Sequence, residues 1–113
     1  MHELSIVMSI VDIATKQTQQ ANAQEVEEIE LVIGELSGVE MSSFDFAWTQ
    51  GIRNSVLENA RREIIRPEGM ARCIDCDAEF KIHQFFDPCP KCNSHFVSIL
   101  QGKEMRVKSL VVK

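Results

Sequence analysis

The sequence predicts an α+β fold in which a three-stranded sheet, with two helices on one face, is interrupted by a small four-cysteine module. Helical and strand-like apolar patterns alternate through the first 66 residues. All four cysteines fall within one short stretch that has little periodicity, and an apolar strand pattern resumes after that stretch. A sheet that is completed after a cysteine-rich insertion accounts for this order.

Two helices are predicted from the spacing of apolar residues. Residues 3–16 carry apolar side chains at intervals of three and four, and the polar stretch from Lys16 onward ends the pattern. Residues 42–50 repeat this spacing, and Ser42 with Asp45 three residues later resembles an N-capping pair. We therefore expect two helices that pack against one sheet.

Three strands of the sheet are predicted over residues 26–33, 62–66 and 104–112. Apolar and polar side chains alternate in the first and last of them, which is the period of a strand with one exposed face. The first strand is acidic and the last is basic, so if they pair, cross-strand charges would help to set their register. A further apolar run, residues 96–100, follows the cysteines.

Composition limits the classes of function. The 113-residue chain carries a net charge of −5, and residues 1–60 hold ten acidic but only two basic side chains. A surface of this sign disfavours nucleic acid and anionic membranes as partners. No apolar run approaches the ~20 residues that span a bilayer, and the N-terminus lacks the pattern of a signal peptide. We therefore expect a cytoplasmic protein whose cysteines stay free of disulfides.

The cysteines form two Cys-x-x-Cys pairs, Cys73 with Cys76 and Cys89 with Cys92, separated by twelve residues. Two such pairs can surround one ion with four thiolates in the tetrahedral arrangement that zinc prefers. Rubredoxin-like iron, an iron–sulfur cluster and a redox dithiol are the alternatives. Four thiolates fill a zinc shell and leave no position for water, which predicts a structural site in a zinc-ribbon-like domain of residues 69–98.

The cysteine module also contains aromatic and histidine side chains. We interpret Phe80, Phe85 and Phe86 as core residues rather than base-stacking residues, because the module is slightly acidic. His83 and His95 are interpreted as surface residues or as hydrogen-bond donors near the thiolates. The sharper alternative is that an imidazole replaces a thiolate when the pH or a second metal changes.

The N-terminus offers a different kind of metal site. The amine of Met1, the amide nitrogen of His2 and the His2 imidazole can close fused chelate rings around one ion. Nitrogen ligands in a square plane suit Ni(II) or Cu(II). On spacing alone, an exposed histidine near the start of a helix is the simpler interpretation.

Four motifs stand in order along the chain. They are Met1-His2-Glu3-Leu4-Ser5, Ile33-Gly34-Glu35-Leu36-Ser37-Gly38-Val39-Glu40, the second cysteine pair Cys89-Pro90-Lys91-Cys92, and Val107-Lys108-Ser109-Leu110. Together they resemble the HypA/HybF family of hydrogenase nickel-incorporation proteins over essentially the whole chain. One departure is Asp77, which stands where the first cysteine pair of that family is usually followed by glycine. Aspartate tolerates left-handed backbone, as does Asn93 after the second pair.

The resemblance implies a metallochaperone rather than an enzyme, with a nickel-binding domain of residues 1–68 and 99–113. The nickel ligand of the family falls on His2, with the Met1 amine and neighbouring backbone nitrogens completing the shell. Glu3 is then a ligand or a positioning group, and Glu40 lies near the site or acts as a helix-start carboxylate. Zn(II) is implied on the four cysteines, one ion per chain, and Ni(II) is the transferred cargo.

The resemblance also implies partners: the GTPase HypB and the large subunit of a [NiFe] hydrogenase, with urease accessory proteins as further candidates. We expect a monomer or a weak homodimer. Two other functions compete with this one. The first is a zinc-stabilised protein–protein adaptor that does not transfer nickel, and the second is a nucleic-acid-binding ribbon, which the acidic module disfavours.

Overall fold

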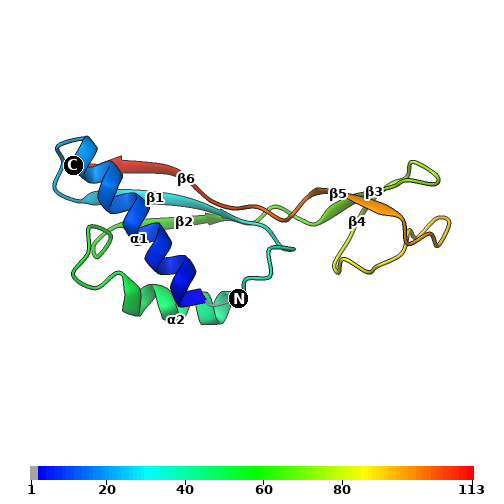
Figure 1. Ribbon diagram of the computed structural model, residues 1–113, viewed down its shortest axis with the longest axis horizontal. Helices are drawn as coiled ribbons and strands as arrows, with labels where there is room; N and C mark the ends of the chain where they lie inside the picture. The colour runs from blue at the N-terminus through cyan, green and yellow to red at the C-terminus, as the bar shows by residue number, and fades with distance from the viewer. Residues whose placement is uncertain (1–2) are drawn as a thin grey trace. The chain divides into compact units, whose positions relative to one another are not determined.

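The computed structural model describes residues 3–113, which contain two helices and six strands (Figure 1). These elements are α1 (Glu3–Gln20), β1 (Val26–Ile33), α2 (Met41–Gly51), β2 (Arg61–Ile65), β3 (Met70–Cys73), β4 (Glu79–Lys81), β5 (Val97–Gln101) and β6 (Met105–Val112). They divide into two compact units, of which unit 2 comprises Val32–Gly38 and Ile65–Arg106 and unit 1 the rest. The predicted α+β class is confirmed. Neither helix is long and apolar enough to cross a membrane.

Unit 1 is built on the three-stranded sheet β2-β1-β6. Figure 1 shows α1 running across these strands, and α1 also packs against α2. The core draws buried apolar side chains from both helices, from β1 and from the chain before β2: Val7, Ile10, Ala14, Val26, Ile29, Leu31, Phe44, Ala47, Trp48 and Leu57. The acidic strand β1 and the basic strand β6 are neighbours, and Lys108 Nζ lies 3.9 Å from a Glu30 carboxylate oxygen.

The first helix extends to Gln20, four residues beyond its predicted end. Its last turns are polar but consist largely of residues with fair helix propensity. The hydroxyls of Thr15 and Thr18 each donate to the carbonyl four residues earlier, at 2.7 Å, and Thr18 is buried. The polar composition therefore marks a more exposed stretch of helix rather than its end.

The second helix begins at Met41, and its N-cap is Glu40 rather than the predicted pair of Ser42 and Asp45. The Glu40 carboxylate accepts hydrogen bonds from the Ser43 N–H at 2.6 Å and from the Ser42 hydroxyl at 2.7 Å. A carboxylate at this position satisfies an otherwise unpaired helical N–H and faces the positive end of the helix dipole.

Unit 2 has a sheet of its own, β4-β3-β5, of which only the apolar run at 96–100 was foreseen. Ala71 pairs with Phe80 on one side and with Ile99 on the other, both antiparallel. Strands β3 and β4 are too short to show an alternating pattern in the sequence. The buried cluster of this unit contains two of the cysteines: Leu36, Ala71, Cys73, Phe80, Ile82 and Cys89.

Chain segments of unit 2 approach closely at Gly34 and Gly102. A side chain at Gly34 would collide with the carbonyl of Gly102, which itself has φ +114°. The Gly34 N–H donates to the Glu104 carbonyl and the Leu36 N–H to the Gly102 carbonyl, each at 2.7 Å. These bonds hold the segment that carries Leu36 into the cluster with Cys73.

Candidate metal centre

The two cysteine pairs adopt the same local structure, which we call knuckles: Cys73–Asp77 and Cys89–Asn93. In the first knuckle the Cys73 N–H donates to the Ala78 carbonyl at 2.8 Å, and in the second the Cys89 N–H donates to the Ser94 carbonyl at 2.8 Å. In each knuckle the N–H of the last residue donates to the carbonyl of the first cysteine, at 2.9 and 2.8 Å. This repeated turn points both thiols of a pair toward the same side.

The residue that closes each knuckle has left-handed backbone, with φ 62° at Asp77 and 63° at Asn93. This conformation is disfavoured for most side chains, but aspartate and asparagine adopt it more readily than the others. The expectation that Asp77 can replace the usual glycine is therefore confirmed. Local sequence chemistry, rather than packing from outside, sets the shape of both turns.

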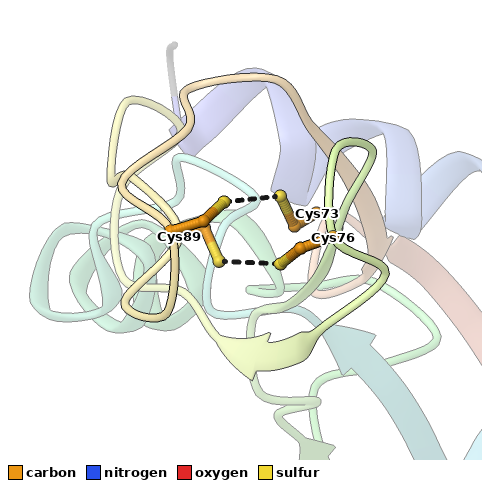
Figure 2. Close-up of side chains that lie close together, drawn as sticks. Cys73, Cys76 and Cys89 are labelled. Atoms are coloured by element: carbon orange, nitrogen blue, oxygen red, sulfur yellow. Dashed lines mark hydrogen bonds between the residues drawn. The ribbon is translucent and has the colours of Figure 1, made fainter.

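The four thiols converge on one space (Figure 2). The Sγ atoms of Cys73 and Cys92 lie 3.5 Å apart, those of Cys76 and Cys89 lie 3.7 Å apart, and all four lie within 4.8 Å of one another. Cys73 and Cys89 are buried, whereas the other two lie nearer the surface, and none forms a disulfide. The structure thus brings together all four cysteines that the sequence singled out.

Thiols this close cannot all ionise unless a cation balances them. Burial raises the pKa of Cys89, but hydrogen bonds from the backbone of Cys92 and Lys91 outweigh it and lower this pKa to about 7. For Cys92, the backbone of Ser94 lowers the pKa, but the Cys73 thiol and burial raise it to about 12. The Ala78 backbone hydrogen bond lowers the pKa of Cys76, but burial and the thiols of Cys73 and Cys89 outweigh it, so this pKa is raised. The Cys89 thiolate therefore forms readily, whereas the thiolates of Cys76 and Cys92 are favoured only when a bound cation balances their charge.

The arrangement fits a structural metal ion such as zinc. A tetrahedral ion with Zn–S bonds of ~2.3 Å separates its sulfur ligands by about 3.8 Å, close to the Cys73–Cys92 and Cys76–Cys89 sulfur distances here. Four sulfur donors leave no position for a substrate or water, so the site suits folding rather than catalysis. Among the described residues, the metal-binding cluster contains only cysteines, and His83 and His95 are exposed.

The phenylalanines of unit 2 differ from the prediction. Phe80 is buried, but Phe85 and Phe86 are 57% and 73% exposed, so their assignment to the core was wrong. The Asp87 carboxylate accepts from the backbone N–H of His83 at 3.0 Å and from that of the next residue at 3.1 Å. This braced turn keeps both rings at the surface, which the sequence pattern alone did not reveal.

The predicted nickel ligands Met1 and His2 lie outside the described residues. Glu3 is the first residue of α1, and its carboxylate accepts a long hydrogen bond of 3.4 Å from the Glu40 N–H. The Glu40 carboxylate is exposed, and hydrogen bonds from Ser42 and then Ser43 lower its pKa to about 2. Glu40 is therefore a helix-start carboxylate, one of its two predicted roles, and its backbone contacts the residue that follows the predicted nickel ligand.

The fold and the four-thiol site define a small α+β protein with a metal-binding unit. A family model described as "Hydrogenase/urease nickel incorporation, metallochaperone, hypA" matches residues 1–112. The chain belongs to this HypA family, as its motifs suggested. Family members are nickel metallochaperones for hydrogenase and urease, which is consistent with a protein that is not an enzyme.

Individual relatives match over nearly their entire lengths. The chain is 50% identical to "Hydrogenase maturation factor HypA" of Parabacteroides distasonis, covering 100% of this chain and 98% of that protein. It is 42% identical to the protein of the same name from Geotalea uraniireducens, covering 100% of both. The solution structure of the Ni metallochaperone HypA from Helicobacter pylori matches with a TM-score of 0.68 and 32% identity, covering 99% of this chain and 97% of the other.

Proposed function

We propose that this protein binds Ni(II) at its N-terminus and, with the GTPase HypB, delivers it to the large subunit of a [NiFe] hydrogenase. The observation that carries this proposal is the family match over residues 1–112, which includes the Met1-His2-Glu3 start. The family description also mentions urease, so urease accessory proteins are a second destination. Reduced thiols suit a reducing compartment, which supports a cytoplasmic location.

The nickel shell consists of the His2 imidazole, the Met1 amine and backbone nitrogens of the same segment. Such a set of nitrogen donors suits square-planar Ni(II). Glu3 is a ligand or a positioning group of this segment, and one oxygen of its carboxylate accepts a long hydrogen bond from the Glu40 N–H. This contact tethers the first turn of α1 to the start of α2 and supports a nickel site beside Glu40, within a nickel-binding domain of residues 1–68 and 99–113.

Zinc on Cys73, Cys76, Cys89 and Cys92 keeps the domain of residues 69–98 folded. Two of these cysteines are fully buried in the apolar cluster of unit 2, so ion binding and core formation are coupled. When bound, zinc supplies a charge that holds four thiolates together and offers no open position to a substrate. It is therefore a resident structural ion, whereas nickel is cargo.

A zinc-stabilised adaptor that does not itself transfer nickel is the second candidate function. The exposed aromatic rings of Phe85, Phe86 and Phe96 on unit 2 favour a docking role, because exposed aromatic side chains are common in protein interfaces. An adaptor would retain zinc but would bind no nickel at its N-terminus.

Isothermal nickel titration of the untagged protein and of His2→Ala tests the proposal. We expect one nickel ion with a micromolar Kd, about −8 kcal/mol, for the parent and no stoichiometric binding for His2→Ala. His95→Ala is the matched control and should bind as the parent does. If His2→Ala bound nickel equally well, the N-terminal site would be wrong and the adaptor function would be favoured.

A further inference from the structure

One side-chain hydrogen bond connects the two cysteine knuckles. Asp75 lies between the cysteines of the first knuckle, and Ser94 directly follows the second. The Ser94 hydroxyl donates to a carboxylate oxygen of Asp75 at 2.5 Å. Hydrogen bonds to an ionised acceptor are short and stronger than neutral ones. The knuckles are thus linked by the protein itself as well as by any ion that their thiols share.

Ser94 is held in place by two further contacts. Its hydroxyl oxygen accepts the Phe96 N–H at 3.1 Å, and its carbonyl accepts the N–H of Cys89 at 2.8 Å. The first contact orients the hydroxyl toward Asp75, and the second connects the same residue to the backbone of a thiol-bearing position. A displacement of Asp75 would therefore change the positions of both cysteine pairs.

The two knuckles have the same backbone structure, but only one of the two equivalent side-chain hydrogen bonds between them can form. The position equivalent to Asp75 in the second knuckle is Lys91, and the position equivalent to Ser94 after the first knuckle is Ala78. Alanine has no hydroxyl, so the reverse hydrogen bond cannot form. The shared turn explains the shape of each knuckle, but it does not explain why Asp75 and Ser94 meet.

We propose that Asp75 and Ser94 form a clasp that holds the two knuckles at metal-binding distance and slows the release of the ion. Neither residue belongs to the four-thiol cluster, so both are positioning residues. This inference rests on the zinc site proposed above. Release of a four-coordinate ion requires one cysteine pair to separate from the other, and the clasp opposes that separation because it spans the same gap.

The test measures zinc transfer from the full-length, zinc-loaded protein to an excess of a colorimetric zinc-binding dye, which is both the acceptor and the indicator. Ser94→Ala and Asp75→Ala should each release zinc about tenfold faster than the parent, as loss of supporting hydrogen bonds does at other metal sites. The double variant should be no faster than either single variant, because both substitutions remove the same bond. Ser94→Thr retains the hydroxyl and should release zinc slowly.

Control variants separate the clasp from other effects. Ser98→Ala, at an exposed serine of β5, should match the parent. Asp75→Asn removes the charge but keeps an oxygen acceptor, so it should lie closer to the parent than Asp75→Ala does. Far-UV circular dichroism before zinc release checks that each variant is folded.

Three outcomes would overturn the clasp. They are a parental release rate for Ser94→Ala, additive effects in the double variant, and an Asp75→Asn rate as fast as that of Asp75→Ala. In each case the parent would still hold one zinc ion, and the proposed function would stand. A parent protein without bound zinc would instead overturn the zinc site and the clasp together.

Discussion

The four-thiol centre and the proposed nickel site at residues 1–3 differ in the origin of their donor atoms. The centre draws four side chains from two knuckles, and Cys73 and Cys89 are also part of the core of unit 2. The proposed nickel site draws one side chain, His2, and takes its remaining donors from the chain terminus and the backbone. Of the Met1-His2-Glu3 segment, the structure describes only Glu3, whose carboxylate accepts one long hydrogen bond from the Glu40 N–H.

Under the proposed function, this difference explains how one small protein would keep one metal and release another. Removing an ion from the four-thiol centre exposes core residues and leaves several thiols to be protonated. A terminal site with a single fixed side chain can lose its donors one at a time to a partner. In the proposed function, retention of zinc follows from its coupling to the core, and transfer of nickel follows from the absence of that coupling.

The largest expected effect is that of Cys73→Ala, which removes a buried donor. Zinc content should fall from one ion per chain to none, and unit 2 should become sensitive to proteases, because its core depends on the ion. Nickel titration should remain parental. Metal analysis and limited proteolysis measure these effects, with Ile74→Ala, an exposed residue of the same knuckle, as control. Loss of nickel binding in Cys73→Ala would contradict the independence of the two sites.

The pH dependence of zinc affinity should be steep. In the metal-free protein at pH 7, Cys92 with a pKa of about 12 and Cys76 with a raised pKa carry protons that zinc must displace. Affinity should therefore rise by at least about a hundredfold per pH unit above pH 7. Below about pH 7 Cys89 also binds a proton that zinc must displace, and the slope should increase. Chelator competition between pH 6 and 9 measures it, and a flat profile would exclude ligation by these thiols.

A smaller effect is expected at the left-handed position of the first knuckle. Asp77→Val should destabilise unit 2 by about 1–2 kcal/mol, because a β-branched residue is strongly disfavoured at φ 62°. Asp77→Asn and Asp77→Gly tolerate this backbone and should stay close to the parent. Thermal unfolding of the zinc-loaded variants provides the comparison. Equal stability of the valine and asparagine variants would argue that backbone strain does not matter here.

The smallest effect is expected at Glu40, the N-cap of α2. The carboxylate of Glu40 has a pKa of about 2, below its ordinary value of 4.5, so it is held more tightly in the folded protein when ionised. Its contribution to stability is present above pH 4.5 and is lost as the pH falls toward 2. Glu40→Gln should therefore lower the melting temperature slightly at pH 7 and have almost no effect near pH 2. A difference that is the same at both values would assign the effect to something other than the charge.

Several elements could be predicted because their signals are local. The alternating residues of β1 form the strand that was expected, over the same residues 26–33. The paired cysteines converge because each Cys-x-x-Cys turn is closed by its own backbone hydrogen bonds. The end of α1, the Glu40 cap and the exposure of Phe85 and Phe86 could not be predicted, since each depends on which side chains the rest of the unit covers.

The sequence by itself determined the α+β class, the four thiols and the family, because periodicity, short spacings and motif order are properties of the chain. Only the tertiary structure decided that the strands around the cysteine pairs form a second sheet and that Leu36 joins the core with Cys73. The tertiary structure also placed Asp75 against Ser94, nineteen residues apart. Such contacts depend on how separate turns meet in space, and no local pattern of residues encodes that meeting.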